Sequence, residues 1–296
     1  MFYNWAMKNL ALILISLLII TSCHTASDFD KYKHHVITLA SDEFEGRKPG
    51  TPGGIKTKNY IADHYASLGL SSFGDSYLMP VYLTGVNLVV DQSSFDLSVN
   101  GEVLELAYPS DVVYGTTRQV DAVSFQDSDL VFVGYGVNAP EYDWNDYKID
   151  VKGKTVVMLI NDPGFELKGT EFNGKAMTYY GRWTYKFEEA ARQGAAAAII
   201  IHEENAAAYP WSVVENSWTG PQLDLQRKNL GIDRCILESW ISLDSANNIL
   251  EFTGFDYLTL KEFALDRNFQ AFTLKGLKLT ATIKSCLLYT SDAADE

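Results

Sequence analysis

Cysteine is scarce in this sequence, which contains only Cys23, Cys235 and Cys286. So few thiols exclude a disulfide framework of the kind that stabilises small secreted domains, and no Cys-x-x-Cys pair is present to hold a metal. We expect Cys235 to be a small, buried apolar residue. A bond between Cys235 and Cys286 would require an oxidising compartment, and the sequence leaves that alternative open.

Positive charge is also in short supply. The 296 residues include 24 Lys and Arg against 38 Asp and Glu, a formal net charge of −14. No basic stripe is present to neutralise phosphates, so we expect no nucleic-acid partner. With 47% hydrophobic and 21% charged residues, the chain can build a sizeable globular core in one or two domains.

Common catalytic signatures are missing as well. There is no Gly-x-Ser-x-Gly elbow, no Gly-x4-Gly-Lys-Ser/Thr phosphate loop, no dinucleotide fingerprint and no His-Glu-x-x-His pair. The five histidines are His24, His34, His35, His64 and His202. We expect those at positions 34, 35 and 64 to occupy solvated or half-buried helix positions.

Acidic residues offer only weak candidates for a site. His202 is followed by Glu203 and Glu204, but adjacent side chains on a strand point to opposite faces and are poorly placed to share one metal ion. Two pairs of nearby acids occur further upstream: Glu141 with Asp143, and Asp146 with Asp150. Acid–base catalysis would depend on a carboxylate separation that the sequence does not specify, so we expect a solvated loop face there.

Residues 1–22 have the pattern of an export signal. Lys8 precedes an apolar run over residues 10–20, too short to span a membrane but suited to the core of a signal peptide. Thr21, Ser22 and Cys23 follow, and they resemble a bacterial lipobox, in which the cysteine is lipidated and becomes the mature N-terminus. In the alternatives, Cys23 only lies near a signal-peptidase cut, or the run remains as an uncleaved anchor. Each version exports the chain, and the first anchors it by lipid to a membrane of the periplasm or cell envelope.

Residues 28–70 form the most informative stretch, because a turn rich in glycine and proline separates two segments with helical periodicity. The first segment has Asp28 as its expected N-cap and an apolar face made by Phe29, Tyr32, Val36 and Leu39. The second has an apolar face made by Ile61, Ala62, Tyr65 and Leu68. Gly69 suits the left-handed position after a helix, with Leu70 as its hydrophobic contact.

The turn between these helices, residues 45–54, alternates flexible glycines with prolines of fixed φ. Alone, this pattern is compatible with an ordinary helix connection. The run SDEFEGRKPGTPGG, followed by an amphipathic helix that ends in Leu-Gly-Leu, resembles the opening of the mature domain in the di-zinc aminopeptidases of metallopeptidase family twenty-eight.

Past Leu70 the pattern changes from helical to alternating. Asn100 and Gly101 separate two β-prone runs and predict a hairpin. Residues 155–160 are apolar throughout, as in a strand covered on both faces. A helix over residues 185–193, with Phe187, Ala190 and Ala191 inside and Glu188, Glu189 and Arg192 outside, is stopped by Gly194 and followed by an apolar strand over residues 195–202. Together these segments predict a right-handed parallel strand–helix–strand unit.

The runs GYGVNAPEYDWNDY, VKGKTVVMLINDPGF and KFEEAARQGAAAAIIIHE resemble a protease-associated domain of the kind inserted into some peptidases of the same family. We therefore expect a mixed α/β fold, in which an N-terminal helical part of a peptidase domain (residues 23–84) precedes a β-rich insert (residues 85–265). The long excursion over residues 162–184 is expected to form either a lid or cleft wall, or a surface loop packed by its own aromatic residues.

The C-terminal region is less regular. We expect helices over residues 242–253 and 259–267, and an alternating strand over residues 277–283 within a segment (266–285) that leads back toward the peptidase domain. The last eleven residues, 286–296, resemble translated adapter sequence, so we treat them as a non-native tail.

The family resemblance implies an exported aminopeptidase that removes N-terminal residues from peptides with two zinc ions. The histidines, aspartates and glutamates that would bind the zincs have no counterpart in this sequence, so we expect an N-terminal fragment that binds no zinc and is inactive by itself. Arg47 and Thr51, in the turn, are the residues we expect near the family's cleft. The alternatives are a non-catalytic surface binding module of protease-associated fold, or a family relative that has lost its metals.

Overall fold

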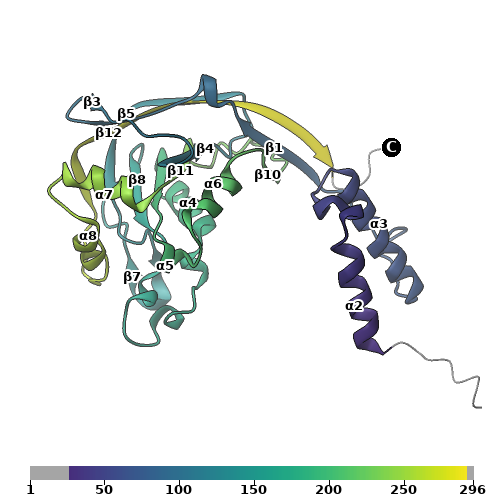
Figure 1. Cartoon of the computed structure of the whole chain (residues 1–296). Helices are drawn as coiled ribbons and strands as arrows, with labels where there is room; N and C mark the ends of the chain where they lie inside the picture. The colour runs from purple at the N-terminus through teal and green to yellow at the C-terminus, as the bar shows by residue number, and fades with distance from the viewer. Residues whose placement is uncertain (1–26, 292–296) are drawn as a thin grey trace, which may run out of the picture. The chain divides into compact units, whose positions relative to one another are not determined.

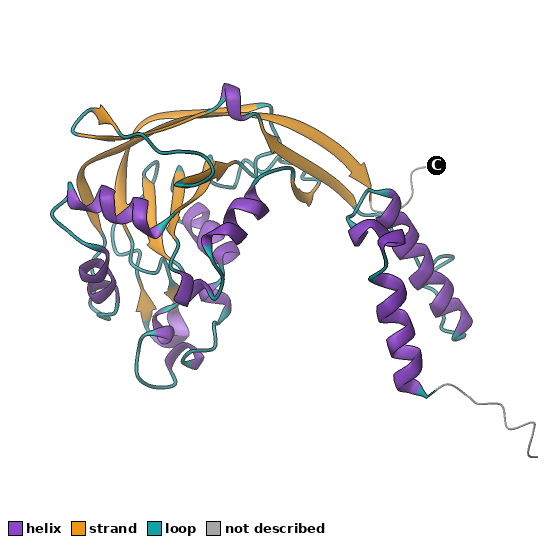
Figure 2. Cartoon of the chain, in the orientation of Figure 1, coloured by secondary structure: helices purple, strands orange, loops and turns teal. Residues whose placement is uncertain are grey.

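The computed structural model describes residues 27–291 (Figures 1 and 2). The predicted signal peptide, Cys23 and the last five residues of the predicted non-native tail lie outside the described residues. The chain divides into two compact units, Met1–Pro80 with Ser291–Glu296 (unit 1) and Val81–Thr290 (unit 2). No helix in the described part of the chain is both long and apolar enough to cross a membrane.

The described part of unit 1 is built on a helix pair, α2 (Asp28–Leu39) and α3 (Pro52–Ser67), joined by a 3₁₀ segment (Asp42–Arg47). The N-cap of α2 is Ser27 and not Asp28, because Ser27 and Asp30 form a reciprocal capping box. At the end of α3, Gly69 has φ of 69° and both hydrogen bonds of a Schellman motif are present. The prediction for Gly69 is therefore confirmed.

Two glycines of the turn allow α3 to approach the 3₁₀ segment closely. A Cβ atom on Gly53 would lie 2.2 Å from the carbonyl oxygen of Phe44, and one on Gly54 would lie 2.3 Å from that of Lys48. Both contacts are with backbone atoms, which cannot rotate away as the end of a side chain can. Only glycine fits at these two positions, so the turn that carries the sequence motif has a steric reason for its composition.

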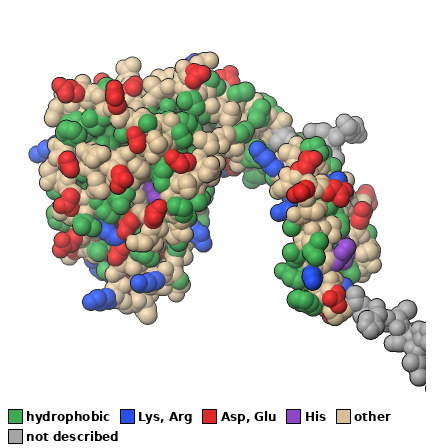
Figure 3. Space-filling view, viewed as in Figure 1, with side chains coloured by type: hydrophobic (Ala, Val, Ile, Leu, Met, Phe, Trp, Pro, Cys, Tyr) green, Lys and Arg blue, Asp and Glu red, His purple; other side chains and the backbone are tan. Residues whose placement is uncertain are grey.

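The apolar faces predicted for α2 and α3 are present but largely exposed. Phe29 is 71% exposed and Tyr32 is 67% exposed. Figure 3 shows apolar side chains at the surface of this helix pair. Among the described residues of unit 1, only Phe44, Gly53 and Gly54 are buried. The helix pair thus presents an apolar surface that its own packing does not cover.

Unit 2 is a mixed α/β domain, as the sequence predicts. Its ten-stranded sheet has the order β10-β1-β12-β5-β8-β9-β11-β4, with β2 paired to β12 and β3 to β2. The strands are β1 (Tyr82–Leu88), β2 (Ser94–Val99), β3 (Glu102–Val103), β4 (Val112–Gly115), β5 (Ala122–Phe132), β8 (Thr155–Leu159), β9 (Ala197–Ile201), β10 (Gln222–Leu225), β11 (Leu237–Ile241) and β12 (Phe272–Ser291). A separate two-stranded sheet pairs β6 (Asn138–Ala139) with β7 (Trp144–Asn145).

Helices follow or connect these strands in unit 2. They are α4 (Trp183–Arg192), α5 (Glu204–Ala207), α6 (Trp211–Trp218), α7 (Leu243–Glu251) and α8 (Tyr257–Ala264). Helix α7 begins after Ser242, whose hydroxyl accepts a hydrogen bond from the Ser245 amide, and α8 begins after Asp256, which caps it in the same way. Helix α8 therefore starts two residues before, and ends three residues before, the helix that the sequence predicts.

The predicted strand–helix–strand unit is present as β8, α4 and β9, and the two strands are parallel. Strand β5 pairs in parallel with β8, and β11 pairs in parallel with β9, so the parallel core has four strands. Every residue of β8, β9 and β11 is buried. Strands buried on both faces need a continuous apolar sequence, which explains the apolar runs.

The two faces of this sheet are covered by different helices. Ile241 of β11 and Ile199 of β9 line an apolar space with Ile249 of α7. Glu238 of β11 lies three residues from Ile241, hence on the opposite face, and it lines a cleft with residues of α4 and α6. Helix α7 therefore covers one face, while α4 and α6 lie on the other.

The structure also tests the predicted hairpin and the strand predicted over residues 277–283. Asn100 and Gly101 both have positive φ, 50° and 93°, in the predicted hairpin between β2 and β3. The alternation predicted for residues 277–283 is confirmed by the burial of Leu277, Leu279, Ala281 and Ile283. This strand, β12, is longer than predicted, and it pairs with two strands from earlier in the chain, β2 and β5.

Helix α4 differs from its predicted amphipathic pattern. Phe187 and Ala190 are buried as expected, but Glu189, which we expected on the outer side, is buried too. Its carboxylate accepts hydrogen bonds from Arg192 Nε and Gln193 Nε2, both at 2.7 Å. Lys186 is also fully buried. Periodicity describes one buried face only, whereas α4 is buried on more than one side.

We predict that Gly53→Ala destabilises the α2–α3 pair by about 1–3 kcal/mol, because the new methyl group collides with the Phe44 carbonyl. Hydrogen–deuterium exchange of α3 peptides measures the effect locally and should show faster exchange. Asn59→Ala, at an exposed position of α3, is the control and should leave exchange unchanged. Unchanged protection of α3 in Gly53→Ala would contradict the close approach.

Candidate functional site

The carboxyl ends of parallel strands are where open α/β sheets usually bind ligands. In unit 2 this edge is filled by the protein's own polar groups. The buried Lys186 ammonium donates to the carbonyl oxygens of Tyr135 and Asn161. The buried Asp162 carboxylate accepts hydrogen bonds from the Gly164 amide and from both the amide and hydroxyl of Thr178. Lys186 and Asp162 are thus satisfied within the protein, so neither is free to bind a ligand.

The excursion over residues 162–184 covers that edge, and several of its aromatic residues hold it in place. Phe172 is fully buried and stacks on Tyr142 with ring centroids 4.3 Å apart, and Tyr180 meets the Phe172 ring edge-on. Of the two alternatives given by the sequence, this packing matches the loop held by its own aromatic residues. Trp183, at the end of the excursion, is instead 42% exposed, and its ring contacts Phe187 and Trp218.

A cleft of about 330 Å³ lies on the face of the sheet that α4 and α6 cover. Its lining residues come from β1, the end of β4, α4, α6, β10 and the region of β11: Val86, Gly115, Thr116, Thr117, Trp183, Thr184, Phe187, Glu188, Trp218, Gln222, Leu223, Asp224, Arg234 and Glu238. The volume falls at the lower end of the range for small-molecule sites, and the lining mixes aromatic walls with a few polar groups, as such sites do.

One wall of this cleft is aromatic. Trp183 and Phe187 lie on α4 one turn apart, and Trp218 closes α6. The rings are tilted against one another, with centroids 6.1 Å apart for Trp183 and Phe187, 5.9 Å for Phe187 and Trp218, and 6.4 Å for Trp183 and Trp218. Phe187 is buried in the core and contacts both tryptophans, so it fixes the position of their rings at the cleft.

The opposite side carries a buried carboxylate. Glu238 is only 2% exposed, and its Oε1 accepts a hydrogen bond of 3.0 Å from Thr117 Oγ1. Register places it there, because Glu238 of β11 is the direct cross-strand partner of Gly115, two residues before Thr117. Burial raises the pKa of Glu238 to about 7, against the lowering effects of the Thr117 hydrogen bond and the Arg234 charge.

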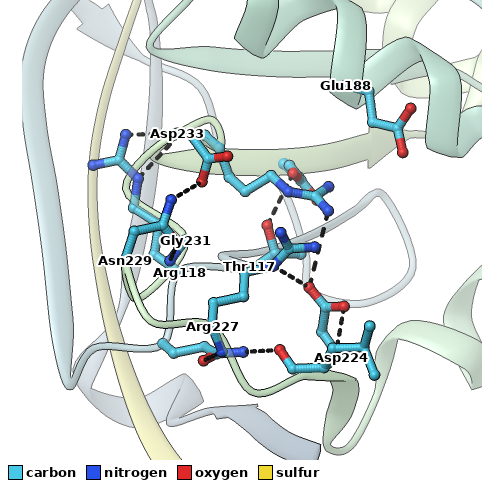
Figure 4. Close-up of polar contacts among 12 residues, drawn as sticks. Thr117, Arg118, Glu188, Asp224, Arg227, Asn229, Gly231 and Asp233 are labelled. Carbon is cyan, nitrogen blue, oxygen red and sulfur yellow. Dashed lines mark hydrogen bonds and ion pairs between the residues drawn. The ribbon is translucent and has the colours of Figure 1, made fainter.

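The remaining polar lining is held by a network around the segment between β10 and β11 (Figure 4). Arg227 Nε lies 2.9 Å from Asp224 Oδ2, and Arg234 lies 3.9 Å from the same oxygen. Arg118 donates two hydrogen bonds to the Arg234 carbonyl, of 2.7 and 3.1 Å. Figure 4 shows Glu188 on α4, apart from this network. Asp224 is therefore neutralised within the protein, whereas Glu238 is not.

Arg47 and Thr51, which we expected near a cleft, have structural contacts in the helix pair of unit 1. Arg47 donates to the carbonyl oxygen of Leu39, the last residue of α2, and so caps that helix. Thr51 is the N-cap of α3, and its hydroxyl accepts a hydrogen bond of 3.3 Å from the Gly54 amide. Neither residue lines the cleft of unit 2, and their proximity to the family's cleft stays a prediction.

The histidines and the acid pairs take varied positions. His35 and His64 lie with ring centroids 4.3 Å apart, and His35 Nδ1 is 2.6 Å from the Tyr60 hydroxyl. His202 is buried among aromatic rings, and its Nε2 has no hydrogen-bond partner in the described structure. Burial lowers the pKa of His202, which favours the neutral ring.

The expectation of a solvated loop face fails for Asp146. This side chain is buried and accepts hydrogen bonds of 2.9 Å from the Val137 amide and from Trp144 Nε1. Burial raises its pKa to about 7. Glu141, by contrast, is exposed and accepts a hydrogen bond from the Tyr180 hydroxyl, which is the main cause that lowers its pKa.

Metal ligands do not converge in the part of the chain that the structure describes. Across residues 27–291 no group of three or more His, Cys, Asp or Glu is placed to hold a metal ion. Within that range Cys235 and Cys286 are free thiols, the first buried and the second exposed, so Cys235 is the buried residue that we expected. The donor set therefore does not fit a pair of zinc ions.

The cleft residues Trp183, Trp218, Thr117 and Glu238 were not among the sequence-predicted site residues. They come from four separated segments, and no local motif connects them. The only hint in the sequence is Glu238 itself, a single charged residue inside the otherwise uncharged run LESWI. A single charge in a short strand without other charged residues indicates either a buried polar contact or a site.

Comparison with known proteins finds a distant similarity only. No family model and no curated protein matches the sequence. Among solved structures, an aminopeptidase from Aneurinibacillus sp. strain AM-1 matches with a TM-score of 0.35 and 16% identity, over 82% of this chain and 42% of its own. BSAP, a zinc aminopeptidase from Bacillus subtilis, matches with a TM-score of 0.32 and 14% identity, over 88% of this chain and 45% of its own. The chain thus spans less than half the length of either protein.

We predict that Glu238→Gln changes the pH dependence of stability. The folded-state pKa of about 7 lies above the ordinary value of 4.5, so the folded protein binds the extra proton and loses stability as pH rises between these values. The free energy of unfolding of Glu238→Gln, relative to the unsubstituted protein, should rise between pH 5 and pH 8 by on the order of 1–3 kcal/mol.

Urea unfolding at several pH values measures this difference. Glu251→Gln, which removes an exposed carboxylate from α7, is the matched control and should show a flat difference across the same range. A flat difference for Glu238→Gln as well would show that the carboxyl group is solvated or paired in the folded protein.

Proposed function

We propose that this chain is the N-terminal, non-catalytic part of an exported zinc-dependent aminopeptidase that removes N-terminal residues from peptides. In this proposal unit 1 belongs to the peptidase domain, and the part of unit 2 that ends at residue 265 is a protease-associated domain inserted into it. The proposed segments are those predicted from the sequence: residues 23–84, the insert over 85–265, a return segment over 266–285 and a non-native tail over 286–296.

The observation that carries the proposal is the exposed apolar face of the α2–α3 pair. Two helices that bury little more than Phe44 lack the apolar burial that stabilises a helical unit in water. Exposed aromatic residues on α2, such as Phe29 and Tyr32, need a further layer of protein. A peptidase sheet, which the SDEFEGRKPGTPGG motif leads us to expect, would supply that layer.

Catalysis is assigned to a further part of the polypeptide. Zinc in such an enzyme would activate water and polarise the scissile carbonyl, but the described residues of this chain have no donor group that fits it. In this proposal the chain contributes to the peptidase domain a helix pair, α2 and α3, of fixed geometry. Arg47 and Thr51 fix the ends of the two helices, and the glycines between them set how closely α3 lies against the turn.

We predict that the purified 296-residue chain, supplied with zinc, shows no chelator-sensitive hydrolysis of aminoacyl nitroanilides and holds less than one zinc per chain by elemental analysis. A longer product that continues the reading frame, with His-x-Asp and paired glutamates in its added part, should hydrolyse these substrates and lose the activity with a chelator. Two tightly held zinc ions in the chain alone would overturn the proposal.

A second candidate is a non-catalytic surface binding protein with a protease-associated fold. The cleft on unit 2 favours it, because that cleft needs no peptidase domain to bind a ligand. A peptidase that has lost its metals would behave in the same way. The continuation of the reading frame separates these proteins from the aminopeptidase, since they would lack the His-x-Asp and paired-glutamate sequences.

We also propose that the protein is held on a membrane of the periplasm or cell envelope by a lipid on Cys23. Replacing Cys23 with Ala should abolish incorporation of labelled fatty acid in a bacterial host and move the protein from the membrane fraction to the soluble fraction, because lipid chains supply the membrane affinity. Replacing Cys286 with Ala is the control and should alter neither result. Continued labelling of Cys23→Ala would contradict the lipid anchor.

A further inference from the structure

The cleft of unit 2 contains a carboxylate that lacks a charged partner. Buried carboxylates are normally paired with a cation or satisfied by several donors. In the described structure, Thr117 is the only hydrogen-bond partner of the Glu238 carboxylate, and no ion pair reaches it. Asp162 shows the contrast, since three donors satisfy that buried carboxylate. The Glu238 carboxylate can therefore accept a further hydrogen bond from a donor that enters the cleft.

The charges around the cleft favour a cation. Its lining includes Glu188, Asp224 and Glu238 but one basic residue, Arg234. Arg234 lies 3.9 Å from Asp224, which Arg227 also contacts at 2.9 Å. Glu188 accepts a hydrogen bond of 2.8 Å from the Tyr179 hydroxyl and is only 3.8 Å from the exposed Arg192. Arg227 and Arg234 thus lie at Asp224 and Arg192 lies at Glu188, so no basic side chain forms an ion pair with Glu238 in the described structure.

The aromatic wall suits the rest of such a ligand. Trp183 is 42% exposed, and Trp218 is half-buried beside it. Tryptophan faces attract alkylammonium and guanidinium groups and also cover the methylene stems that carry them. A space of about 330 Å³ accommodates a single extended side chain and not a folded surface.

We infer that this cleft binds a basic side chain of a peptide, lysyl or arginyl, with the cationic group at Glu238 and the alkyl stem against Trp183 and Trp218. The residues of the cleft carry this inference without the aminopeptidase proposal. If unit 2 does belong to a peptidase, the cleft would recognise basic residues in its peptide substrates.

Three probes of equal backbone test the inference on the full chain: the Nα-acetyl methylamides of lysine, arginine and norleucine. Titration followed by tryptophan fluorescence reports on Trp183 and Trp218, and isothermal titration calorimetry provides an independent constant. The lysine and arginine probes should saturate with a dissociation constant of about 1 mM or tighter, and norleucine, which has the stem without the charge, should bind at least about tenfold more weakly.

Two variants locate the binding. Glu238→Gln keeps the shape and the Thr117 contact and should weaken binding of the lysine probe by about tenfold, whereas Trp183→Ala should weaken all three probes by about fivefold. Thermal unfolding shows that each variant is folded. Glu251→Gln, an equal charge change on the other face of the sheet, should bind as the unsubstituted protein does.

The pH dependence of lysine-probe binding provides a further readout, because it would not change if Glu238 had only a structural role. Glu238 is faced by Thr117 from the end of β4, Arg234 before β11, Asp224 on β10 and Glu188 on α4. Because the cation prefers the ionised carboxylate, affinity for the lysine probe should rise several-fold from pH 6 to pH 8, and Glu238→Gln should abolish this rise.

Equal binding of norleucine and lysine, unaltered affinity in Glu238→Gln, or stronger binding of a neutral sugar such as methyl glucoside would overturn the assignment. Absence of any saturable binding of the lysine probe up to about 50 mM would overturn it as well. None of these outcomes depends on peptidase activity, so failure of the aminopeptidase proposal and failure of this one are distinguishable.

Discussion

Burial of the parallel strands on both faces is the constraint on which unit 2 depends. Strands β8, β9 and β11 have no exposed residue, so each side chain must find room under α7 on one face or under α4 and α6 on the other. At roughly 25 cal/mol for each Å² of apolar surface removed from water, this core supplies the largest stabilising term of the unit. Any polar residue in these strands is buried whichever face it points to, because helices cover both faces.

The buried polar groups then separate by how well they are satisfied. Lys186 donates to two carbonyl oxygens and Asp162 accepts from three donors, so these residues close the carboxyl edge of the sheet as part of the architecture. Glu238 has one donor and lies at a cleft with aromatic walls. The desolvation of a carboxylate with a single partner is what raises the pKa of Glu238, and a cationic ligand would relieve it.

The helix pair of unit 1 shows why a motif and a site need not coincide. The turn between α2 and α3 carries the strongest resemblance in the sequence, and its conspicuous residues have local structural contacts. Gly53 and Gly54 admit the backbone of the preceding segment, Thr51 caps α3, and Arg47 caps α2. These residues build a rigid turn, and that role is independent of the function of the surrounding domain. The function of the domain depends on what covers the exposed apolar face.

Local chemistry was sufficient for much of this protein. The Asn100 and Gly101 hairpin, the Schellman end at Gly69, the β8–α4–β9 unit and the burial of Cys235 follow from patterns of a few neighbouring residues, and the sequence determined them. The pairing of β12 with strands far upstream, the burial of Lys186, Glu189 and Asp146, and the cleft at Glu238 were decided only by the tertiary structure. The physical reason is that pairing and desolvation depend on which segments the fold brings together. Some of these lie more than a hundred residues apart, as Thr117 and Glu238 do, and no local pattern encodes which of them meet.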